Sequence, residues 1–285
     1  MNFDKRKLQA GLYLVGVPIG TARDITLRAL DTLASADVLA AEDTRSLRKL
    51  MDIHGVPLEG RRIRALHDHS GQGQVAALVE DARTRAVAYA SEAGMPLIAD
   101  PGFELVRAAQ AAGVAVTSAP GPSAVTTALA LAGLPTDAFF FAGFLPPGQS
   151  ARRNMLEGHA EIPGTLCYYE SPKRLAKMLR DAAEVLGGGR TAVICRELTK
   201  RFEEVRHGTL EELADEMAGA TVKGEICVLV GKGSPKISEV DVELVLKDAL
   251  GQMSLRDAVD HVAAAHNMPR RKVYQAALRL TKEGQ

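Results

Sequence analysis

The stretch Ala88-Tyr-Ala-Ser-Glu-Ala-Gly-Met-Pro-Leu-Ile-Ala-Asp-Pro-Gly-Phe103 decides the fold that we expect for this chain. Small apolar residues over 86–90 predict a buried strand, glycine and proline predict a loop, and a helix is predicted over 103–112. In open α/β sheets this order presents backbone N–H groups to a ligand beyond the strand ends. The loop has few polar side chains, which suits a partly apolar cofactor. A tight connection without any ligand is the alternative.

The composition indicates a folded protein of about two domains. The chain has 285 residues, of which 46% are hydrophobic and 25% are charged, so it can bury sizeable cores and is not disordered. Lys and Arg together number 35, as do Asp and Glu, so any nucleic-acid site must be a local patch. The sequence has neither the apolar start of a signal peptide nor an apolar run of about 18 residues that could span a membrane. We therefore expect a soluble cytoplasmic protein.

Cysteine and histidine give little reason to expect a metal. Cys167, Cys195 and Cys227 each lie inside an apolar run that predicts a strand, and their wide spacing fits neither a zinc site nor a disulfide framework. Buried, reduced thiols are the expected state. His67 and His69 form a His-x-His pair, but no Cys or Glu follows at ligand spacing. We expect a polar loop there, in a position to contact substrate, and no metal.

The first half of the chain predicts a repeated order of strand and helix. This order favours a parallel sheet with right-handed crossovers. Gly16 and Gly20 do not complete a dinucleotide fingerprint, so they are weak evidence for a nucleotide. Strands are expected over 11–17, 37–41, 86–90 and 114–117, and helices over 26–36, 46–54, 72–83 and 103–112.

Two carboxylates, Glu42 and Asp43, follow the second expected strand, with Arg45 close behind. The carboxyl ends of strands are where α/β sheets place their chemistry. The simpler alternative is that Asp43 or Thr44 caps the next helix.

A second glycine- and proline-rich turn over 119–124 runs into a helix expected over 125–132. Ser123 could cap that helix while its hydroxyl and N–H stay available to a ligand, and a plain cap is the alternative. We expect the junction between two domains near Pro120.

The second half of the chain predicts a mixed sheet and then a helical tail. Strands are expected over 139–145, 165–169, 191–195 and 223–230, an exposed or antiparallel strand over 202–207, and helices over 172–186 and 209–217. Pro172 is expected at the first position of its helix.

After a linker over 231–236, helices that begin at Ser238, Ser254 and Arg270 resemble a helix-turn-helix, with the turn at 267–269. The last of these helices, expected over 270–282, is basic. It could contact nucleic acid, be merely solvated, or contact a second copy through its apolar residues Val273, Ala276, Ala277 and Leu280.

Several motifs stand in a specific order along nearly the whole chain. They are Leu14-Val-Gly-Val-Pro-Ile-Gly20, Ala41-Glu-Asp-Thr-Arg45, Leu66-His-Asp-His69, Ser91-Glu-Ala-Gly-Met-Pro-Leu-Ile-Ala-Asp-Pro-Gly102, Pro120-Gly-Pro-Ser-Ala124, Tyr169-Glu-Ser-Pro-Lys-Arg174, Arg196-Glu-Leu-Thr-Lys200 and Lys223-Gly-Glu225. Together they resemble the ribosomal RNA small-subunit methyltransferase I family, which belongs to the tetrapyrrole-methylase fold of S-adenosylmethionine (SAM) methyltransferases.

This resemblance implies two α/β domains with SAM in the cleft between them. The expected domains are an N-terminal one with a parallel sheet over 1–119, a C-terminal one with a mixed sheet over 120–232, and a helical tail over 233–285. The resemblance also implies 2′-O-methylation of a cytidine in the decoding region of 16S rRNA, usually by a homodimer that acts on the rRNA or the small ribosomal subunit.

The resemblance further implies which residues line the cofactor, much of the contact being through backbone groups. These residues are Gly94, Met95, Pro96, Leu97, Ser123, Ala124, Tyr169, Glu170, Glu197, Leu198, Gly224, Glu225 and Ile226. The sequence departs from the family pattern at Thr21, where Asn is usual, at Glu92, where Asp is usual, and at Met95, where Thr is usual. If the family's Thr side chain binds the cofactor, Met95 loses that hydrogen bond.

The expected chemistry needs a base for the ribose hydroxyl, since the sulfonium methyl is already activated. Asp43 is our first candidate, followed by Glu42 and Asp100. Arg45 and Lys200 would hold phosphates or a developing oxyanion.

Contact with RNA is expected from three basic regions: residues 45–64, Arg152 with Arg153, and the last helix. A tetrapyrrole C-methyltransferase is the alternative enzyme. A non-catalytic RNA-binding assembly factor of the ribosome is the alternative of another class.

Overall fold

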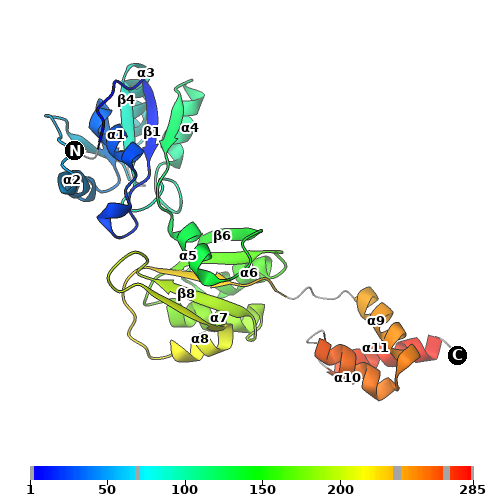
Figure 1. The fold of residues 1–285 in the computed structure, drawn as a ribbon. Helices are drawn as coiled ribbons and strands as arrows, with labels where there is room; N and C mark the ends of the chain where they lie inside the picture. Colours follow the sequence, from blue (N-terminus) through cyan, green and yellow to red (C-terminus); the bar gives the residue numbers. More distant parts are fainter. Residues whose placement is uncertain (1–2, 68–70, 234–238, 266–269, 284–285) are drawn as a thin grey trace. The chain divides into compact units, whose positions relative to one another are not determined.

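The computed structural model describes residues 3–67, 71–233, 239–265 and 270–283 (Figure 1). It divides into two compact units, Met1–His159 with Pro163–Lys232 and Ala160–Ile162 with Gly233–Gln285. The larger unit contains two five-stranded sheets. The smaller unit contains three helices.

The first sheet is entirely parallel, with the strand order β3-β2-β4-β1-β5. The prediction of a parallel sheet is therefore confirmed. The sequence missed β3, which is only three residues long and polar at its centre. The strands are β1 (Gly11–Val15), β2 (Val38–Ala41), β3 (Ile63–Ala65), β4 (Ala86–Ala90) and β5 (Val116–Ala119).

Helices cover both faces of this sheet, because its strands are apolar on both sides. On β4, Ala88 and Ala90 pack in one core with α1 (Leu27–Ser35) and α2 (Thr44–Ile53). Val87 and Tyr89 point the other way and pack with α3 (Gln72–Thr84) and α4 (Phe103–Ala111). The four carboxyl ends of β1, β2, β4 and β5 share one edge of the sheet, because the strands run parallel. The motifs of the first half follow these ends, and the 3₁₀ turn η1 (Ala22–Asp24) lies in the loop after β1.

The second sheet is mixed, as predicted, with the order β6-β7-β10-β8-β9. β6 pairs with β7 in parallel, and the other pairs are antiparallel. Helix α5 (Ala124–Ala132) packs on the face that carries the three cysteines, which are buried and free, as predicted. The strands are β6 (Phe139–Phe144), β7 (Thr165–Glu170), β8 (Thr191–Arg196), β9 (Glu204–Thr209) and β10 (Ile226–Val230).

Helices α6 (Gln149–His159), α7 (Leu175–Leu186) and α8 (Leu210–Glu216) contact one another in sequence order. The sequence missed α6, and the prediction that Pro172 opens the following helix was wrong. The chain first makes a turn in which the Arg174 N–H donates to the Ser171 carbonyl at 3.0 Å, and α7 begins only at Leu175.

The smaller unit packs α9 (Glu239–Gln252), α10 (Leu255–Ala265) and α11 (Arg270–Glu283) around a core of their own. Val273, Ala276 and Ala277 are buried in this core, and Leu280 packs against it. Val273, Ala276 and Ala277 are therefore used within the unit, which contradicts the alternative of a dimer contact through them. Ser238 and the turn at 267–269 lie outside the described residues. In the part of the chain that the structure describes, no helix combines the length and apolarity needed to cross a bilayer.

Candidate functional site

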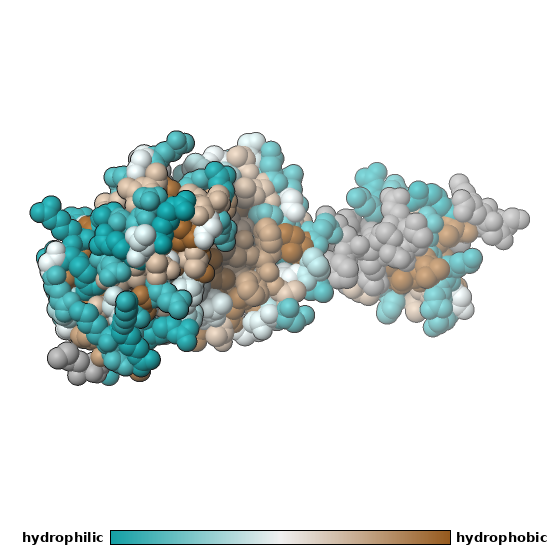
Figure 2. All heavy atoms as spheres, turned by 90° about the horizontal axis from the view of Figure 1, so that it is seen from above, coloured by the Kyte–Doolittle hydropathy of each residue, from teal (hydrophilic) through white to brown (hydrophobic). Residues whose placement is uncertain are grey.

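A cavity of about 460 Å³ lies in the larger unit, lined by loops that follow strands of both sheets. Figure 2 shows hydrophobic side chains around a hollowed region of that unit's surface. A volume of this size is typical of a pocket for a small molecule. From the first sheet the lining residues are Pro18, Ile19, Gly20, Ser46, Glu92, Ala93, Gly94, Met95, Ile98, Ala99 and Asp100; from the rest of the unit they are Ser123, Ala124, Phe144, Tyr169, Glu170, Cys195, Leu198, Lys200, Glu225, Ile226 and Cys227.

The loops after β1, β4 and β5 are joined by backbone contacts at the inner end of this pocket. Val17 and Gly94 exchange two backbone hydrogen bonds of 2.9 and 3.1 Å. A Cβ on Gly16 would lie 2.6 Å from the backbone nitrogen of Gly121, so only glycine fits there. The Met95 sulfur accepts a hydrogen bond from that same nitrogen at 3.2 Å. Met95, one of the departures from the family pattern, thus joins two pocket loops.

Backbone strain is concentrated in two loops of the pocket. Among the described residues, five that are not glycine have left-handed backbone, and four of these are Leu97, Ala99, Glu197 and Thr199. Such conformations cost about 1–3 kcal/mol each and cluster at functional sites. Both loops also contact the segment after β1, one through the Val17–Gly94 hydrogen bonds and the other through the Thr199 hydroxyl, which accepts from the Thr21 N–H at 3.1 Å.

Helix α5 begins at the pocket, with Ser123 as its N-cap residue and Ala124 as its first residue. The Ser123 hydroxyl makes no capping bond to the helix, while the Ser123 carbonyl accepts from the Thr127 hydroxyl at 2.8 Å. The simple alternative, in which the serine hydroxyl caps the helix, is therefore not what the structure shows. The hydroxyl and the helix N–H groups both lie at the pocket wall, where they favour an electron-rich ligand atom.

Glu197, Lys200 and Glu225 form an ion-paired cluster at the wall made by the second sheet. The Lys200 ammonium lies 2.9 Å from Glu197 Oε1 and 3.1 Å from Glu225 Oε2. Burial alone would lower the pKa of Lys200, but the two carboxylates outweigh it and raise the pKa. Lys200 therefore stays protonated, within a cluster that also contains two carboxylates. Gly224 has a left-handed backbone with φ of +92°, which favours glycine, and it packs closely against the Glu197 side chain.

Glu170 brings a buried carboxylate to the pocket wall. Its Oε1 accepts from the Ser171 N–H at 2.7 Å and lies 3.1 Å from Arg174 Nε, whereas its buried Oε2 accepts no hydrogen bond from the described residues. Burial raises the pKa of neighbouring Tyr169, and the charge of Asp100 adds to this effect. The Tyr169 phenol therefore stays protonated.

The three candidate bases lie in different environments. Asp43 caps α2, because its Oδ1 accepts from the N–H groups of Arg45 at 2.8 Å and Ser46 at 3.4 Å. These bonds, the Arg45 one foremost, lower the pKa of Asp43. Glu42 accepts from the Glu92 N–H at 3.2 Å. Asp100 is the only one of the three that lines the pocket.

Other predicted site residues fall outside the lining of the pocket. Arg45 is 92% exposed, beside Asp43. Glu197 pairs with the lining residue Lys200, and Gly224 packs against Glu197, but neither residue lines the cavity itself. Pro96 and Leu97 belong to the loop after β4 but do not line the cavity. The sequence did not identify the lining residues Phe144, Cys195 and Cys227 as site residues, because each lies in an ordinary apolar strand.

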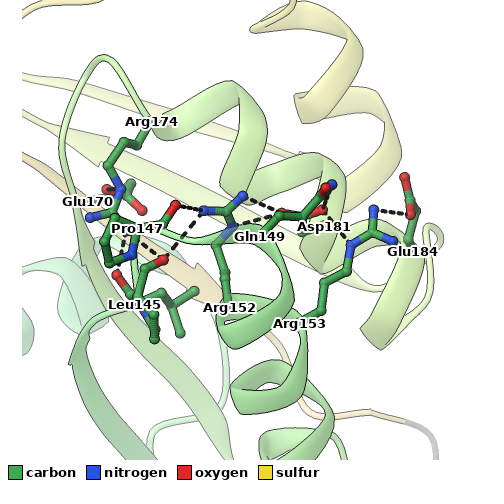
Figure 3. Close-up of polar contacts among 10 residues, drawn as sticks. Leu145, Pro147, Gln149, Arg152, Arg153, Glu170, Arg174, Asp181 and Glu184 are labelled. Carbon is green, nitrogen blue, oxygen red and sulfur yellow. Dashed lines mark hydrogen bonds and ion pairs between the residues drawn. The ribbon is translucent and has the colours of Figure 1, made fainter.

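Arg152 and Arg153, predicted to contact RNA, take part in an internal polar network (Figure 3). The buried Asp181 accepts from the Nε atoms of Arg152 and Arg153, each at 2.7 Å. Arg152 also donates to the Pro147 carbonyl at 3.0 Å, and Arg174 donates to the carbonyls of the same loop. Arg152 is only 3% exposed, so the prediction that it contacts RNA was wrong.

The basic residues between 45 and 64 divide into two groups. Arg61 donates to four backbone carbonyls, and burial lowers its pKa, so it has a structural role. Arg64 forms an ion pair with Asp81. The exposed side chains that could meet a polyanion are those of Arg45, Arg48, Lys49 and Arg62.

The described residues contain no group of three His, Cys, Asp or Glu side chains placed to hold a metal ion. His67 is exposed. Its predicted partner His69 lies outside the described residues.

Comparisons with known proteins show which families and proteins this chain is similar to. Residues 11–214 match the family of Tetrapyrrole (Corrin/Porphyrin) Methylases, and residues 237–281 match the RsmI C-terminal HTH domain. The chain is similar to the ribosomal RNA small subunit methyltransferase I of Mesorhizobium japonicum, with 46% identity over 96% of this chain and 94% of the relative. It is also similar to the protein of that name from Mycobacterium tuberculosis, with 45% identity over 97% of this chain and 98% of the relative.

Solved structures support the fold alone. A crystal structure of diphthine synthase superimposes with a TM-score of 0.60 at 17% identity, covering 77% of this chain and 89% of that one. Uroporphyrin-III-C-methyltransferase from Thermus thermophilus gives a TM-score of 0.55 at 22% identity, covering 79% and 95%.

Proposed function

Since this chain belongs to the tetrapyrrole-methylase family, within its ribosomal RNA small subunit methyltransferase I group, we propose that it methylates the ribose 2′-hydroxyl of a cytidine in the decoding region of 16S rRNA. SAM is the methyl donor. The observation that carries the proposal is the cavity of about 460 Å³, which loops from both sheets line. The substrate is the rRNA itself or the small ribosomal subunit, and the working form is a cytoplasmic homodimer.

The pocket residues fit a ligand of SAM's chemistry. Its wall offers apolar area from Ile19, Met95 and Phe144, together with the unused Ser123 hydroxyl at the start of α5. Glu170 Oε2 is a buried acceptor that could receive an amino or hydroxyl donor. A mostly apolar pocket with a few placed polar groups is typical of cofactor sites. We assign Gly94, Met95, Ser123, Ala124, Tyr169, Glu170, Leu198, Glu225 and Ile226 to its direct lining, and Pro96, Leu97, Glu197 and Gly224 to its support.

SAM supplies an electrophilic methyl group, so the protein must orient the ribose hydroxyl and remove its proton. We assign the role of base to Asp100, because it is the candidate carboxylate that lines the pocket. Asp43 is less suited, because its Oδ1 accepts two backbone hydrogen bonds and its pKa is lowered. Lys200 lines the pocket, but its ammonium already pairs with Glu197 and Glu225, so we do not assign it the role of holding a phosphate or a developing oxyanion.

A pair of isosteric variants separates these roles. We expect Asp100→Asn to lower the turnover number about 10²- to 10⁴-fold, the usual contribution of a general base, with little change in SAM affinity measured by calorimetry. Asp43→Asn, the matched control, should retain near wild-type turnover. If Asp43→Asn loses activity and Asp100→Asn does not, the assignment is reversed.

The reaction itself is tested with labelled SAM and small ribosomal subunits that lack the modification. We expect label in 16S rRNA, in a nucleotide whose 3′ linkage resists alkaline hydrolysis because its 2′-oxygen is blocked. Label on a base or on an added porphyrinogen would contradict the proposal. Binding of subunits and SAM without any transfer would instead support a non-catalytic assembly factor.

A further inference from the structure

Two phenylalanines, Phe103 and Phe202, are the most exposed aromatic side chains among the described residues, each at 63%. Each has an arginine over its ring: the Arg107 guanidinium lies 5.8 Å from the centre of the Phe103 ring, and that of Arg201 lies 5.5 Å from the centre of the Phe202 ring. Arginine placed over an aromatic face is a recurring element of nucleic-acid binding surfaces.

Both phenylalanines follow closely in the chain after residues that line the pocket, one in each of two different loops. Phe103 comes three residues after Asp100, which lines the pocket, so their Cα atoms are at most about 11 Å apart. Phe202 comes two residues after the lining residue Lys200, at most about 7 Å away. The first of these loops follows β4, and the second follows β8.

The local structure does not need either ring. Helix α4 begins at Phe103 after Gly102, and its first turn carries an ion pair of 2.7 Å between Glu104 and Arg107. The turn around Phe202 is closed by the Glu203 N–H, which donates to the Lys200 carbonyl at 3.1 Å. Glu203 in turn accepts from the Thr199 N–H at 2.6 Å. Neither ring is part of the contacts that shape its turn, so both rings are available to a ligand.

We propose that Phe103 with Arg107 and Phe202 with Arg201 are stacking surfaces for the bases of the RNA strand that enters the pocket. This inference rests on the proposed function. A ribose hydroxyl can reach the pocket only if its nucleotide leaves the neighbouring stack, and bases displaced in this way are held against aromatic and arginine side chains. Stacking needs only the π-face of a base, so these surfaces hold the strand without selecting its sequence.

Alanine variants of the two rings give the first test. We expect Phe103→Ala and Phe202→Ala each to raise the apparent KM for small ribosomal subunits about tenfold, from the loss of one stacked base. SAM affinity and the melting temperature should stay unchanged, because the rings are outside both the pocket and the core. Phe139→Ala is the matched control, since Phe139 is 48% exposed but lies at the opposite end of β6 from the pocket residue Phe144.

Tryptophan variants give a readout specific to stacking. The chain contains no tryptophan, so Phe103→Trp and Phe202→Trp each introduce a single tryptophan that can be excited apart from the tyrosines. We expect both to keep a wild-type KM and to show fluorescence quenching when subunits are added, whereas Phe103→Leu should behave like Phe103→Ala. If the KM values of the alanine variants and the tryptophan fluorescence all stay unchanged while the wild type methylates subunits, this inference is overturned and the proposed function stands. If the wild type transfers no methyl group to subunits, both are overturned.

Discussion

Gly16 lies where the backbone after β1 meets the backbone after β5, and this contact fixes one end of the pocket. An added Cβ would come within 2.6 Å of the Gly121 nitrogen and 2.7 Å of the Met95 sulfur. The sulfur could turn away, but the backbone nitrogen could not move without displacing the loop before α5. The geometry of the pocket therefore depends on the absence of a single methyl group.

We expect Gly16→Ala to lower the melting temperature and to weaken SAM binding at least tenfold, because the two loops must separate. The control is Gly73→Ala in α3, where an added Cβ meets nothing within 4 Å. That change should be neutral or stabilise by up to about 1 kcal/mol, as expected for glycine in a helix. Thermal unfolding and calorimetry measure both effects, and equal behaviour of the two variants would contradict the steric argument.

At the scale of elements, the network around Asp181 joins α6 to α7 and holds the loop that follows β6. Asp181 and Arg152 have side chains only 3% and 4% exposed. Removing one partner of such a buried pair leaves an uncompensated charge and typically costs about 3–5 kcal/mol. We expect that cost for Asp181→Asn in urea denaturation. Arg153→Gln, at a residue whose side chain is 35% exposed, should cost about 1 kcal/mol or less.

The same network predicts a pH dependence. Burial would raise the pKa of Asp181, but hydrogen bonds from Gln149, Arg153 and Arg152 outweigh it, and the pKa is lowered. A lowered pKa in the folded state means that this stabilisation is complete above the unfolded value of about 4 and is lost as the pH falls below it. The free energy of unfolding, measured from neutral pH to below pH 4, should therefore fall less steeply with decreasing pH in Asp181→Asn than in the wild type. Equal slopes would show that Asp181 does not contribute.

At the scale of the whole molecule, affinity for RNA must come from local basic patches, because the chain has 35 basic and 35 acidic residues. Arg271, Lys272 and Arg279 are exposed on α11, opposite the residues that form the core of the smaller unit. Each phosphate contact that is lost reduces the salt dependence of binding by about one counterion.

We expect the triple change Arg271→Gln, Lys272→Gln and Arg279→Gln to weaken binding to small ribosomal subunits and to flatten its dependence on salt. SAM affinity should not change. Arg83→Gln is the control, because Arg83 is exposed on α3 but already pairs with Glu80 at 3.1 Å. The test is the affinity for subunits measured at a series of salt concentrations. If affinity falls with salt equally steeply in the triple variant and the wild type, this face of α11 does not contact RNA.

Apolar runs and turn residues were enough to predict both sheets and most helices, because strands buried on both faces are readable from composition. Helix α6 escaped prediction because its buried face consists of Leu156 and the charged Arg152. The partner of Arg152 is Asp181, 29 residues later, and no local pattern links them. For the same reason two arginines next to each other were predicted to meet RNA rather than a carboxylate within the protein.

The candidate site shows a similar limit. The motifs located the loops that line the pocket, because those loops follow parallel strands and share one edge of the sheet. The ranking that places Asp43 ahead of Glu42 and Asp100 had no structural basis, because the three carboxylates differ only in where the folded backbone places them. Asp43 satisfies N–H groups of α2, while Asp100 lines the cavity. That difference depends on tertiary structure alone.

The thiols buried beneath α5 allow local opening of the protein to be measured by their rate of alkylation. Burial raises the pKa of Cys195 to about 11 and that of Cys167 to about 12, so almost no thiolate exists at neutral pH while the sheet is closed. An alkylating reagent can reach these thiols only when α5 separates from the strands, so the labelling rate reports how often this local opening occurs. A ligand that contacts both halves of the pocket should lower the labelling rate. Occupancy by the cofactor can then be measured by mass spectrometry without following any reaction.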